Sequence, residues 1–477
     1  MQPSTRSANA GHAAAMALLL CLWAPAARAL ALQPGLSFTG QTFETASGGF
    51  TIPPDTMGAV GRDHVVEMLN SGFAVYDKET GAPLVTKTLD GFWRDAGVNR
   101  FDTFDPRILY DPEVDRYFAV ALDTPREANS LLVAVSESGD PAGAWTGFAI
   151  DSHGPNTLWA DFPMLGLDSE GVYVGAAMFP IGQSSGLPIA NDVLVLPKAD
   201  LVASVPSIAR ATLFEAVSLQ TTGFNPYPAV DLDGGAPPAK LYAGAAAFLG
   251  VVQVSRVDGP IDAPSLGAQG AIAVDPIGIP PGAVQPGTEQ RLDPRFDTRF
   301  GNVVERGGSV WAVQSVAHPE TGRAAIRWLE IDAATDIVLQ TGIVGDAALD
   351  LIFPSIAVNE LDQIVIGFTG SGESRYASSY AVLGERIEGA TRFGELLLLQ
   401  EGVAAWTLAD GRFGDYSATV VDPEDPAVFW TFQEWVAGPE NWAVQITQLR
   451  VVPEPGTWLL VSAGLAVLAR RRRRPRR

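Results

Sequence analysis

Residues 412–423 read Arg-Phe-Gly-Asp-Tyr-Ser-Ala-Thr-Val-Val-Asp-Pro, and residues 428–433 read Val-Phe-Trp-Thr-Phe-Gln. A polar residue and a turn-former come first, followed by a short apolar run, an Asp turn and a second run rich in aromatic and small residues. Neither run is long enough to be stable alone, so neighbouring elements must cover both sides. The stretch therefore predicts two antiparallel strands inside a larger all-β body.

The same order of parts recurs along the chain. Six further copies of the first strand are found by this order rather than by identity: DTMGAV (55–60), DPRILYD (105–111), DFPMLGLD (161–168), NPYPAVD (225–231), TRFGNVV (298–304) and FPSIAVN (353–359). A loose period of roughly 50 to 74 residues is typical of a radial array of small antiparallel sheets. Seven copies predict a seven-bladed β-propeller whose first strands line a central channel, and a β-sandwich pair with accidental similarity is the alternative.

The composition agrees with many short strands joined by turns. The 477 residues include 49 Gly and 35 Pro, and helix-period runs are nearly absent between residues 36 and 452. The only cysteine is Cys21, so we expect packing rather than disulfide bonds to hold the body together. Four histidines leave little for zinc chemistry or for histidine-based general catalysis.

The body between the two terminal segments is strongly acidic. Nine of the 32 Lys and Arg lie in those segments, whereas 53 of the 54 Asp and Glu lie between them, giving the body a formal charge of about −30. That field repels nucleic acid, so no nucleic-acid partner is expected. It would also attract divalent cations, but the solubility of an exported surface is the preferred explanation of the charge.

Residues 1–29 have the order of a secretory signal peptide. Arg6 precedes an apolar run over residues 13–23, and Ala27-Arg28-Ala29 fits a small-x-small cleavage site. We therefore expect the mature protein to begin near Leu30. A buried N-terminal helix is the alternative, and Leu20 before Cys21 argues against a lipoprotein.

The last 26 residues, 452–477, form a tripartite tail after a body that we place at residues 30–451. A Pro-Glu-Pro motif is followed by an apolar run and a basic cluster: Val452, Pro453, Glu454, Pro455, Gly456, then Trp458 to Ala469, then Arg470, Arg471, Arg472, Arg473, Arg474. This order resembles the PEP-CTERM sorting signal of Gram-negative bacteria, whose processing enzyme is exosortase. The resemblance implies export machinery and exosortase as partners, and delivery to the envelope surface or extracellular matrix. A generic tail anchor is the alternative.

The apolar run of the tail suits transient membrane insertion. Twelve helical residues span about 18 Å, well short of a hydrocarbon core of about 30 Å, so this transmembrane helix is a marginal anchor by itself. The arginine cluster holds its end on the cytoplasmic side. Pro453 and Pro455 keep the preceding segment extended and accessible to a protease.

Parts of the body resemble known propellers. Ser138 to Trp145 resembles the Asp-box turn of sialidase-like propellers, which is structural rather than catalytic. Residues 297–302, 327–331 and 430–434 resemble a group of secreted bacterial sialidase-like or quinoprotein-like propellers of uncharacterised activity. The resemblance implies the fold and export, and it transfers no catalytic residue.

The sequence does not contain a complete hydrolase set. Sialidase chemistry needs an arginine triad that grips a carboxylate, together with a Tyr nucleophile and a paired Glu. Arg107 and Arg299 stand at equivalent strand starts, but no third arginine does, and Tyr416 with Glu434 is a loose analogue. No Gly-x-Ser-x-Gly elbow is present. We therefore expect a binding or structural module for polysaccharide or matrix components, with a sialidase-like glycan hydrolase as the alternative.

One set of polar residues is predicted to converge at a mouth of the channel, because inner strands of a propeller start at the same end. The candidate ligand or cation site consists of Asp55, Asp105, Arg107, Asp161, Arg299 and Asp415. Converging carboxylates either bind a cation, for which Ca²⁺ is the candidate, or pair with the arginines. Alternatively, each Asp caps the turn of its own blade. No other cofactor is predicted.

Overall fold

The computed structural model describes residues 30–46, 51–183, 186–234, 239–294 and 298–453. The chain divides into a compact unit, Leu32–Arg450, and a second unit formed by Met1–Ala31 and Val451–Arg477. The predicted signal peptide, the apolar run Trp458 to Ala469 and the arginine cluster lie outside the described residues. Among the residues that are described, no helix is long and apolar enough to cross a membrane.

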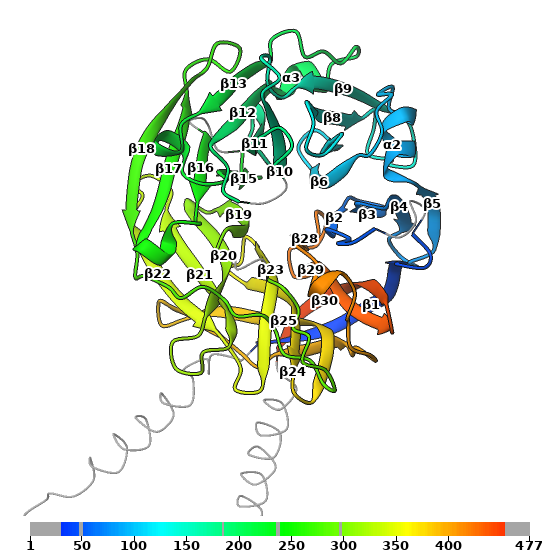
Figure 1. Ribbon diagram of the computed structural model, residues 1–477, viewed down its shortest axis with the longest axis vertical. Helices are drawn as coiled ribbons and strands as arrows, with labels where there is room; N and C mark the ends of the chain where they lie inside the picture. The colour runs from blue at the N-terminus through cyan, green and yellow to red at the C-terminus, as the bar shows by residue number, and fades with distance from the viewer. Residues whose placement is uncertain (1–29, 47–50, 184–185, 235–238, 295–297, 454–477) are drawn as a thin grey trace, which may run out of the picture. The chain divides into compact units, whose positions relative to one another are not determined.

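The unit Leu32–Arg450 is an all-β propeller whose sheets stand around a common centre (Figure 1). Five sheets of four or five strands form separate blades: β2(Met57–Val60), β3(His64–Leu69), β4(Gly72–Asp77), β5(Pro83–Lys87); β6(Phe104–Asp111), β7(Arg116–Leu122), β8(Ser130–Ser136), β9(Trp145–Asp151); β14(Tyr227–Pro228), β16(Ala239–Ala243), β17(Val251–Asp258), β18(Ser265–Ala273); β23(Leu349–Val358), β24(Ile364–Gly372), β25(Arg375–Ile387), β26(Ala390–Phe393), β27(Leu397–Gln400); and β28(Ala418–Val421), β29(Val428–Gly438), β30(Asn441–Pro453), β1(Leu30–Thr42).

The remaining sheet has nine strands. Its order is β13(Thr212–Val217), β12(Ala190–Pro197), β11(Gly171–Pro180), β10(Leu158–Leu167), β15(Val230–Asp231), β19(Phe300–Arg306), β20(Ser309–Ala317), β21(Ala324–Asp332) and β22(Val338–Val344). It is continuous because Val230 on β15 pairs in parallel with Leu167 on β10 and with Val304 on β19. The prediction of seven separate blades is thereby corrected: in the described residues, hydrogen bonding near the centre fuses part of the ring.

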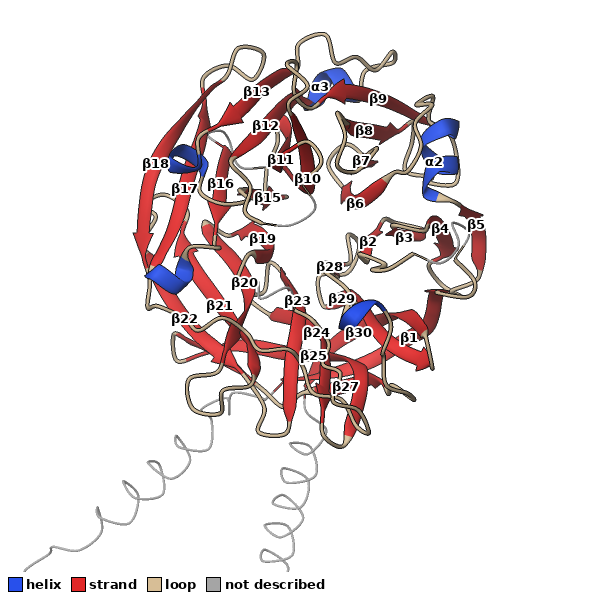
Figure 2. Ribbon diagram, viewed as in Figure 1, coloured by secondary structure: helices blue, strands red, loops and turns tan. Residues whose placement is uncertain are grey.

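Helices are few and short, and Figure 2 shows them in the connections between strands. They are α2(Leu89–Asp95), α3(Lys198–Leu201), α4(Leu219–Thr222), η1(Ala247–Leu249) and η2(Ala409–Gly411). The N-cap of α2 is Thr88, whose hydroxyl accepts a hydrogen bond from the Gly91 amide. The scarcity of helix agrees with the sequence pattern.

The repeated motif marks the start of the inner strands, where the backbone is irregular. Asp55, Asp105 and Asn225 have positive φ angles of 52°, 51° and 57° there. Asp and Asn tolerate this left-handed conformation better than most residues because their short polar side chains can hydrogen-bond locally. The pairing of β6, β10, β19 and β23 with their neighbours shifts register close to this point. Backbone conformation is therefore one reason why a polar residue recurs in the motif.

Strand β1 joins the last blade beside β30, so distant parts of the sequence share one sheet. The Ser37 and Thr447 hydroxyls lie 2.9 Å apart across this pairing. In addition, the Gln41 amide on β1 donates to the buried carboxyl group of Glu67 on β3. Strand β1 thus connects the last blade to the first one in the chain.

The turn at Ser138 to Trp145 joins β8 to β9 in an antiparallel hairpin, as predicted. The Asp140 carboxylate accepts from the Ala142 amide at 2.9 Å, and the Trp145 indole donates to the Pro141 carbonyl at 2.9 Å. The indole packs edge-on against Phe92 of α2. The turn has a structural role, since these contacts fix its backbone and hold the buried Trp145 ring against the helix.

Candidate functional site

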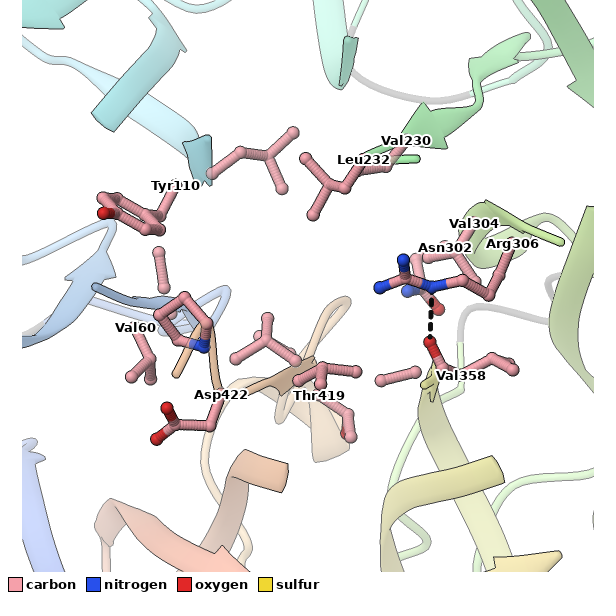
Figure 3. A pocket seen from close by; sticks show the side chains of 18 of the residues that line it. Val60, Tyr110, Val230, Leu232, Asn302, Val304, Arg306, Val358, Thr419 and Asp422 are labelled. Atoms are coloured by element: carbon pink, nitrogen blue, oxygen red, sulfur yellow. Dashed lines mark hydrogen bonds between the residues drawn. The ribbon is translucent and has the colours of Figure 1, made fainter. Parts of the chain in front are cut away.

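A cavity of about 340 Å³ lies along the inner strands and is the main candidate site. It is lined by residues of β2, β6, β15, β19, β23 and β28 and of their adjoining turns. Figure 3 shows the labelled side chains of Val60, Val230, Leu232 and Val304 around a common space. The lining also includes Ala59, Ala357 and Ala418. Small and aliphatic residues therefore leave the central space open, as expected where inner strands converge.

We call the side of the cavity near the last residues of the inner strands the open end. Leu232 and Glu360, two of its more exposed lining residues, follow β15 and β23 there. The Arg306 guanidinium donates to the Val358 carbonyl at 3.3 Å (Figure 3) and pairs with Asp233. The buried Asp422 carboxylate pairs with Lys78 at 2.9 Å. Two charged groups of the open end are thus neutralised by protein partners.

Glu305 and Glu360 complete the charged lining of the open end. Neither makes an ion pair with another described residue. Burial, together with the negative charge of Asp231, raises the pKa of Glu305 to about 7. The nearby Lys240 cation partly opposes the shift at Glu305. The open end therefore carries two carboxyl groups without an ion pair, of which Glu305 is charged only in part at neutral pH.

The opposite end of the inner strands holds a buried network, which we call the charged end. Asn70 links two of the predicted residues: its amide donates to the Asp55 carboxylate at 2.7 Å, and its carbonyl accepts from the Asp105 amide at 2.6 Å. The Asp105 carboxylate also accepts from the Tyr416 hydroxyl at 3.0 Å and from the Phe162 amide at 3.1 Å. Residues from four separate blades or inner strands thus meet at Asp105.

The other predicted residues of the charged end lie in the same network. Asp415 forms a bidentate ion pair with Arg412, with both N–O distances at 2.6 Å. Asp161 accepts from the Phe162 amide at 2.9 Å, and the Arg299 guanidinium stacks on the Phe162 ring at 3.3 Å. The structure therefore brings Asp55, Asp105, Asp161, Asp415 and both predicted arginines toward one end of the axis.

Burial raises the pKa of three carboxyl groups at the charged end, those of Asp55, Asp161 and Glu434. Burial, reinforced by Asp415 and Asp105, holds the pKa of Asp55 well above its ordinary value. Burial and the nearby Asp105 raise the pKa of Asp161 to about 8, although Arg299 opposes the shift. The pKa of Glu434, buried behind Thr56, is raised to about 8, mainly by burial. The network is therefore partly protonated at neutral pH.

Arg107 separates the charged end from the cavity. Its side chain is 1% exposed and donates to the Pro163 carbonyl at 3.0 Å. Its two terminal nitrogens lie 3.4 Å from the Met57 sulfur and 2.9 Å from the Met164 sulfur. The guanidinium stacks 3.6 Å from the centre of the Tyr416 ring and lies 5.8 Å from that of Tyr227. Because Met57 and Tyr227 also line the cavity, this layer closes it on that side.

The six predicted residues differ in the groups that they contact. Asp161 accepts a hydrogen bond from the backbone of its own blade, as turn capping predicts. Asp55 instead accepts from the Asn70 side chain, and Asp105 accepts from the Phe162 amide of the next inner strand. Capping of the turn in the same blade therefore explains only part of the set. Among the described residues, no group of three or more His, Cys, Asp or Glu is arranged to hold a metal ion. The observed partners are instead arginines, amides and a phenol.

Sequence reasoning missed several members of the network. Arg412 stands three residues before Asp415 in the motif itself, so this ion pair had a visible signal. Asn70 lies in the turn between β3 and β4 and Phe162 lies inside a motif, and nothing in the pattern distinguishes either from an ordinary turn or core residue. Their roles depend on contacts between elements far apart in sequence.

Comparison with known proteins identifies the sorting segment. Residues 451–474 match the model of the PEP-CTERM protein-sorting motif. This motif indicates export, sorting to the cell envelope and processing by the exosortase system. No curated protein matches the sequence.

Several solved structures are similar to the propeller. A protein of unknown function from Dyadobacter fermentans has 8% identity and a TM-score of 0.40, over 73% of this chain and 94% of its own. A hypothetical selenium-binding protein from Sulfolobus tokodaii has 8% identity and a TM-score of 0.45, over 72% and 77%. Trypanosoma rangeli sialidase has 10% identity and a TM-score of 0.35, over 76% and 56%. With TM-scores below 0.5, these similarities support no inference about this chain.

Proposed function

We propose that the exported body is a non-catalytic binding module that holds a ligand in the cavity at the open end of its axis. The observation that carries this proposal is the cavity itself: about 340 Å³, lined by inner strands and closed on one side by the Arg107 layer. Concave sites of this size, mostly apolar with a few polar groups, are typical of small-molecule binding.

The burial of the charged end argues against glycan hydrolysis there. Tyr416 and Arg107 do stack, and the Tyr416 hydroxyl bonds Asp105, which is the one observation in favour of a sialidase-like reaction. However, Tyr416 is 2% exposed and Arg107 is 1% exposed, so neither can reach a substrate in this conformation. We therefore assign Asp55, Asp105, Arg107, Asp161, Arg299 and Asp415 a structural role that closes the channel, with hydrolysis as the alternative.

The proposed architecture of the body, residues 30–451, is seven-bladed. Seven inner strands follow the seven sequence motifs, and the nine-stranded sheet contains two runs of four antiparallel strands, β10–β13 and β19–β22. In this proposal each run is a blade, and the two-residue strand β15 is the bridge between them.

The proposed route to the envelope uses both terminal segments. Residues 1–29 act as the signal peptide, Trp458 to Ala469 insert transiently in the inner membrane, and the following arginines stay in the cytoplasm. Intact mass of the protein from the envelope and medium of its native host tests this route. A mass that ends near Pro453 is expected, whereas a mass that retains the arginine tail would leave a plain membrane anchor.

The binding function is tested by filling the cavity. Native mass spectrometry of the protein, purified without denaturant from its host, is expected to show a bound small molecule. Val304→Trp, which fills the space shown in Figure 3, should remove it, and Leu339→Trp on the exposed edge strand β22 is the matched control. Retention of the ligand by Val304→Trp, or turnover of a glycan, would overturn the proposal.

A further inference from the structure

Three polar side chains in the wall of the cavity are already bonded to the protein. The Asn302 side chain donates to the Ile356 carbonyl and accepts from the Ile356 amide, both at 2.8 Å. The Ser417 hydroxyl bonds the Phe353 carbonyl at 2.8 Å, and the Thr419 hydroxyl lies 2.8 Å from that of Ser355. A ligand rich in hydroxyl groups would lose its water here and gain few hydrogen bonds in exchange.

Much of the remaining wall is aliphatic. Val60, Val230, Val304, Val358 and Val420 line it between the open end and the Arg107 layer. Burying apolar surface of a ligand against such a wall contributes roughly 25 cal/mol per Å². The wall therefore selects an apolar chain and discriminates against a sugar.

Charge at the open end selects the other part of the ligand. Arg306 is neutralised by Asp233 and Asp422 by Lys78, whereas Glu305 and Glu360 make no ion pair with a described residue. At the far side, Met57 and Tyr227 separate the cavity from the Arg107 guanidinium. A positive group is thus favoured at the open end and disfavoured at the closed side.

We propose that the cavity binds an unbranched aliphatic chain that ends in an ammonium group. The alkyl chain runs along the valine wall toward Met57 and Tyr227, and the ammonium group lies beside Glu305 and Glu360. This inference rests on the proposed binding function and specifies the chemical class of its ligand.

The test is isothermal titration of the full chain with three soluble probes: decyltrimethylammonium, decanoate and the disaccharide trehalose. Decyltrimethylammonium should bind with a 1:1 stoichiometry and about tenfold more tightly than decanoate, a ratio equivalent to about 1.4 kcal/mol. Trehalose should give no heat of binding. The double variant Glu305→Gln/Glu360→Gln should reduce the preference for the ammonium probe to about twofold or less.

Two cavity variants locate the binding. Val304→Trp should abolish binding of the ammonium probe, and Leu232→Trp, at a position that is 38% exposed, should weaken it with little effect on folding. Leu339→Trp should leave it unchanged. Binding that survives Val304→Trp and Leu232→Trp, stronger binding of decanoate, or failure of all probes to bind would overturn the inference. A co-purified sugar that Val304→Trp displaces would also overturn it while leaving the binding function intact.

Discussion

The two ends of the axis are built by the same inner strands and differ in what fills them. At the charged end, Asp105, Tyr416 and Arg107 are each at most 7% exposed and bond one another or their neighbours across blades. At the open end, small and aliphatic residues leave about 340 Å³ unfilled. The difference shows that one set of strands can close a channel at one end and leave a binding space at the other.

The cause of the difference is the backbone at the two ends. Left-handed residues and register shifts at the strand starts bring Asp55, Asp105 and their neighbours together at the axis. Downstream, β19, β23 and β28 pair in continuous antiparallel register beyond these shifts, and Ala357 and Ala418 keep the bore wide. If this comparison is correct, substitutions at the charged end should mainly change stability, and substitutions at the open end should mainly change binding.

The largest effect is expected for Arg107→Ala. This change removes a buried cation that stacks on Tyr416 and leaves a cavity between Met57 and Met164. The cost should be about 4 kcal/mol of the free energy of unfolding, from lost packing and lost cation–π contact. Urea denaturation measures it.

Arg107→Lys is the control for this prediction, because it keeps the charge and loses the planar contact. It should cost less than the alanine variant. A cost of under about 1 kcal/mol for Arg107→Ala would show that the charged end is not a stabilising network.

The next effect is expected at the open end, for Lys78→Ala. Lys78 is 11% exposed and Asp422 is 5% exposed, and the pair joins the first blade of the chain to the last. Without the lysine, Asp422 keeps only its bond from the Trp430 indole and a backbone amide contact, so the loss should be about 3 kcal/mol. The double variant Lys78→Ala/Asp422→Ala should recover part of this stability in urea denaturation. If the double variant is as unstable as Lys78→Ala, the loss does not come from the ion pair.

The sequence predicted the parts of this comparison that depend on local pattern. The repeated short strands predicted the all-β propeller. The common position of four carboxylates at the strand starts predicted that they converge: Asp55, Asp105, Asp161 and Asp415. The fusion of sheets through Val230 could not be predicted, because it depends on how closely β10 and β19 approach β15 in space.

The chemistry of the two ends was harder to predict. A cation site was weighed for the carboxylates, but their partners include Asn70, Arg412 and Tyr416, which come from other turns and motifs. The cavity at the open end had no distinctive signature in the sequence, since most of its lining consists of small and aliphatic residues that any buried strand would contain. Convergence can be inferred from a repeat, whereas the partners of a converged group depend on the fold.

A smaller effect is expected from pH at the charged end. The pKa of Asp161 is about 8 in the folded protein against an ordinary value of 3.8. The folded state therefore binds more protons than the unfolded state between about pH 4 and pH 8, and stability should fall as pH rises through this window. The melting temperature at pH 8.5 should lie a few degrees below that at pH 5.5, where a shift of about 2–4 °C corresponds to about 1 kcal/mol.

Asp161→Asn should reduce this pH dependence, to which Asp55 and Glu434 also contribute, and Glu79→Gln, at an exposed position on the turn after β4, should leave it unchanged. A melting temperature that rises from pH 5.5 to pH 8.5 in the unmodified protein would contradict the protonated network.

The smallest effect is expected for Arg306→Ala, the counterpart of Arg107→Ala at the open end. Arg306 is 22% exposed and its ion pair with Asp233 is accessible to water, so the loss of stability should be only about 0.5 kcal/mol. Removing the guanidinium takes a positive charge from the cavity wall and frees the Asp233 carboxylate, so affinity for decyltrimethylammonium should rise about twofold in the titration. A loss of stability as large as that of Arg107→Ala would mean that both ends close the ring by the same kind of contact, and the distinction between a structural end and a binding end would fail.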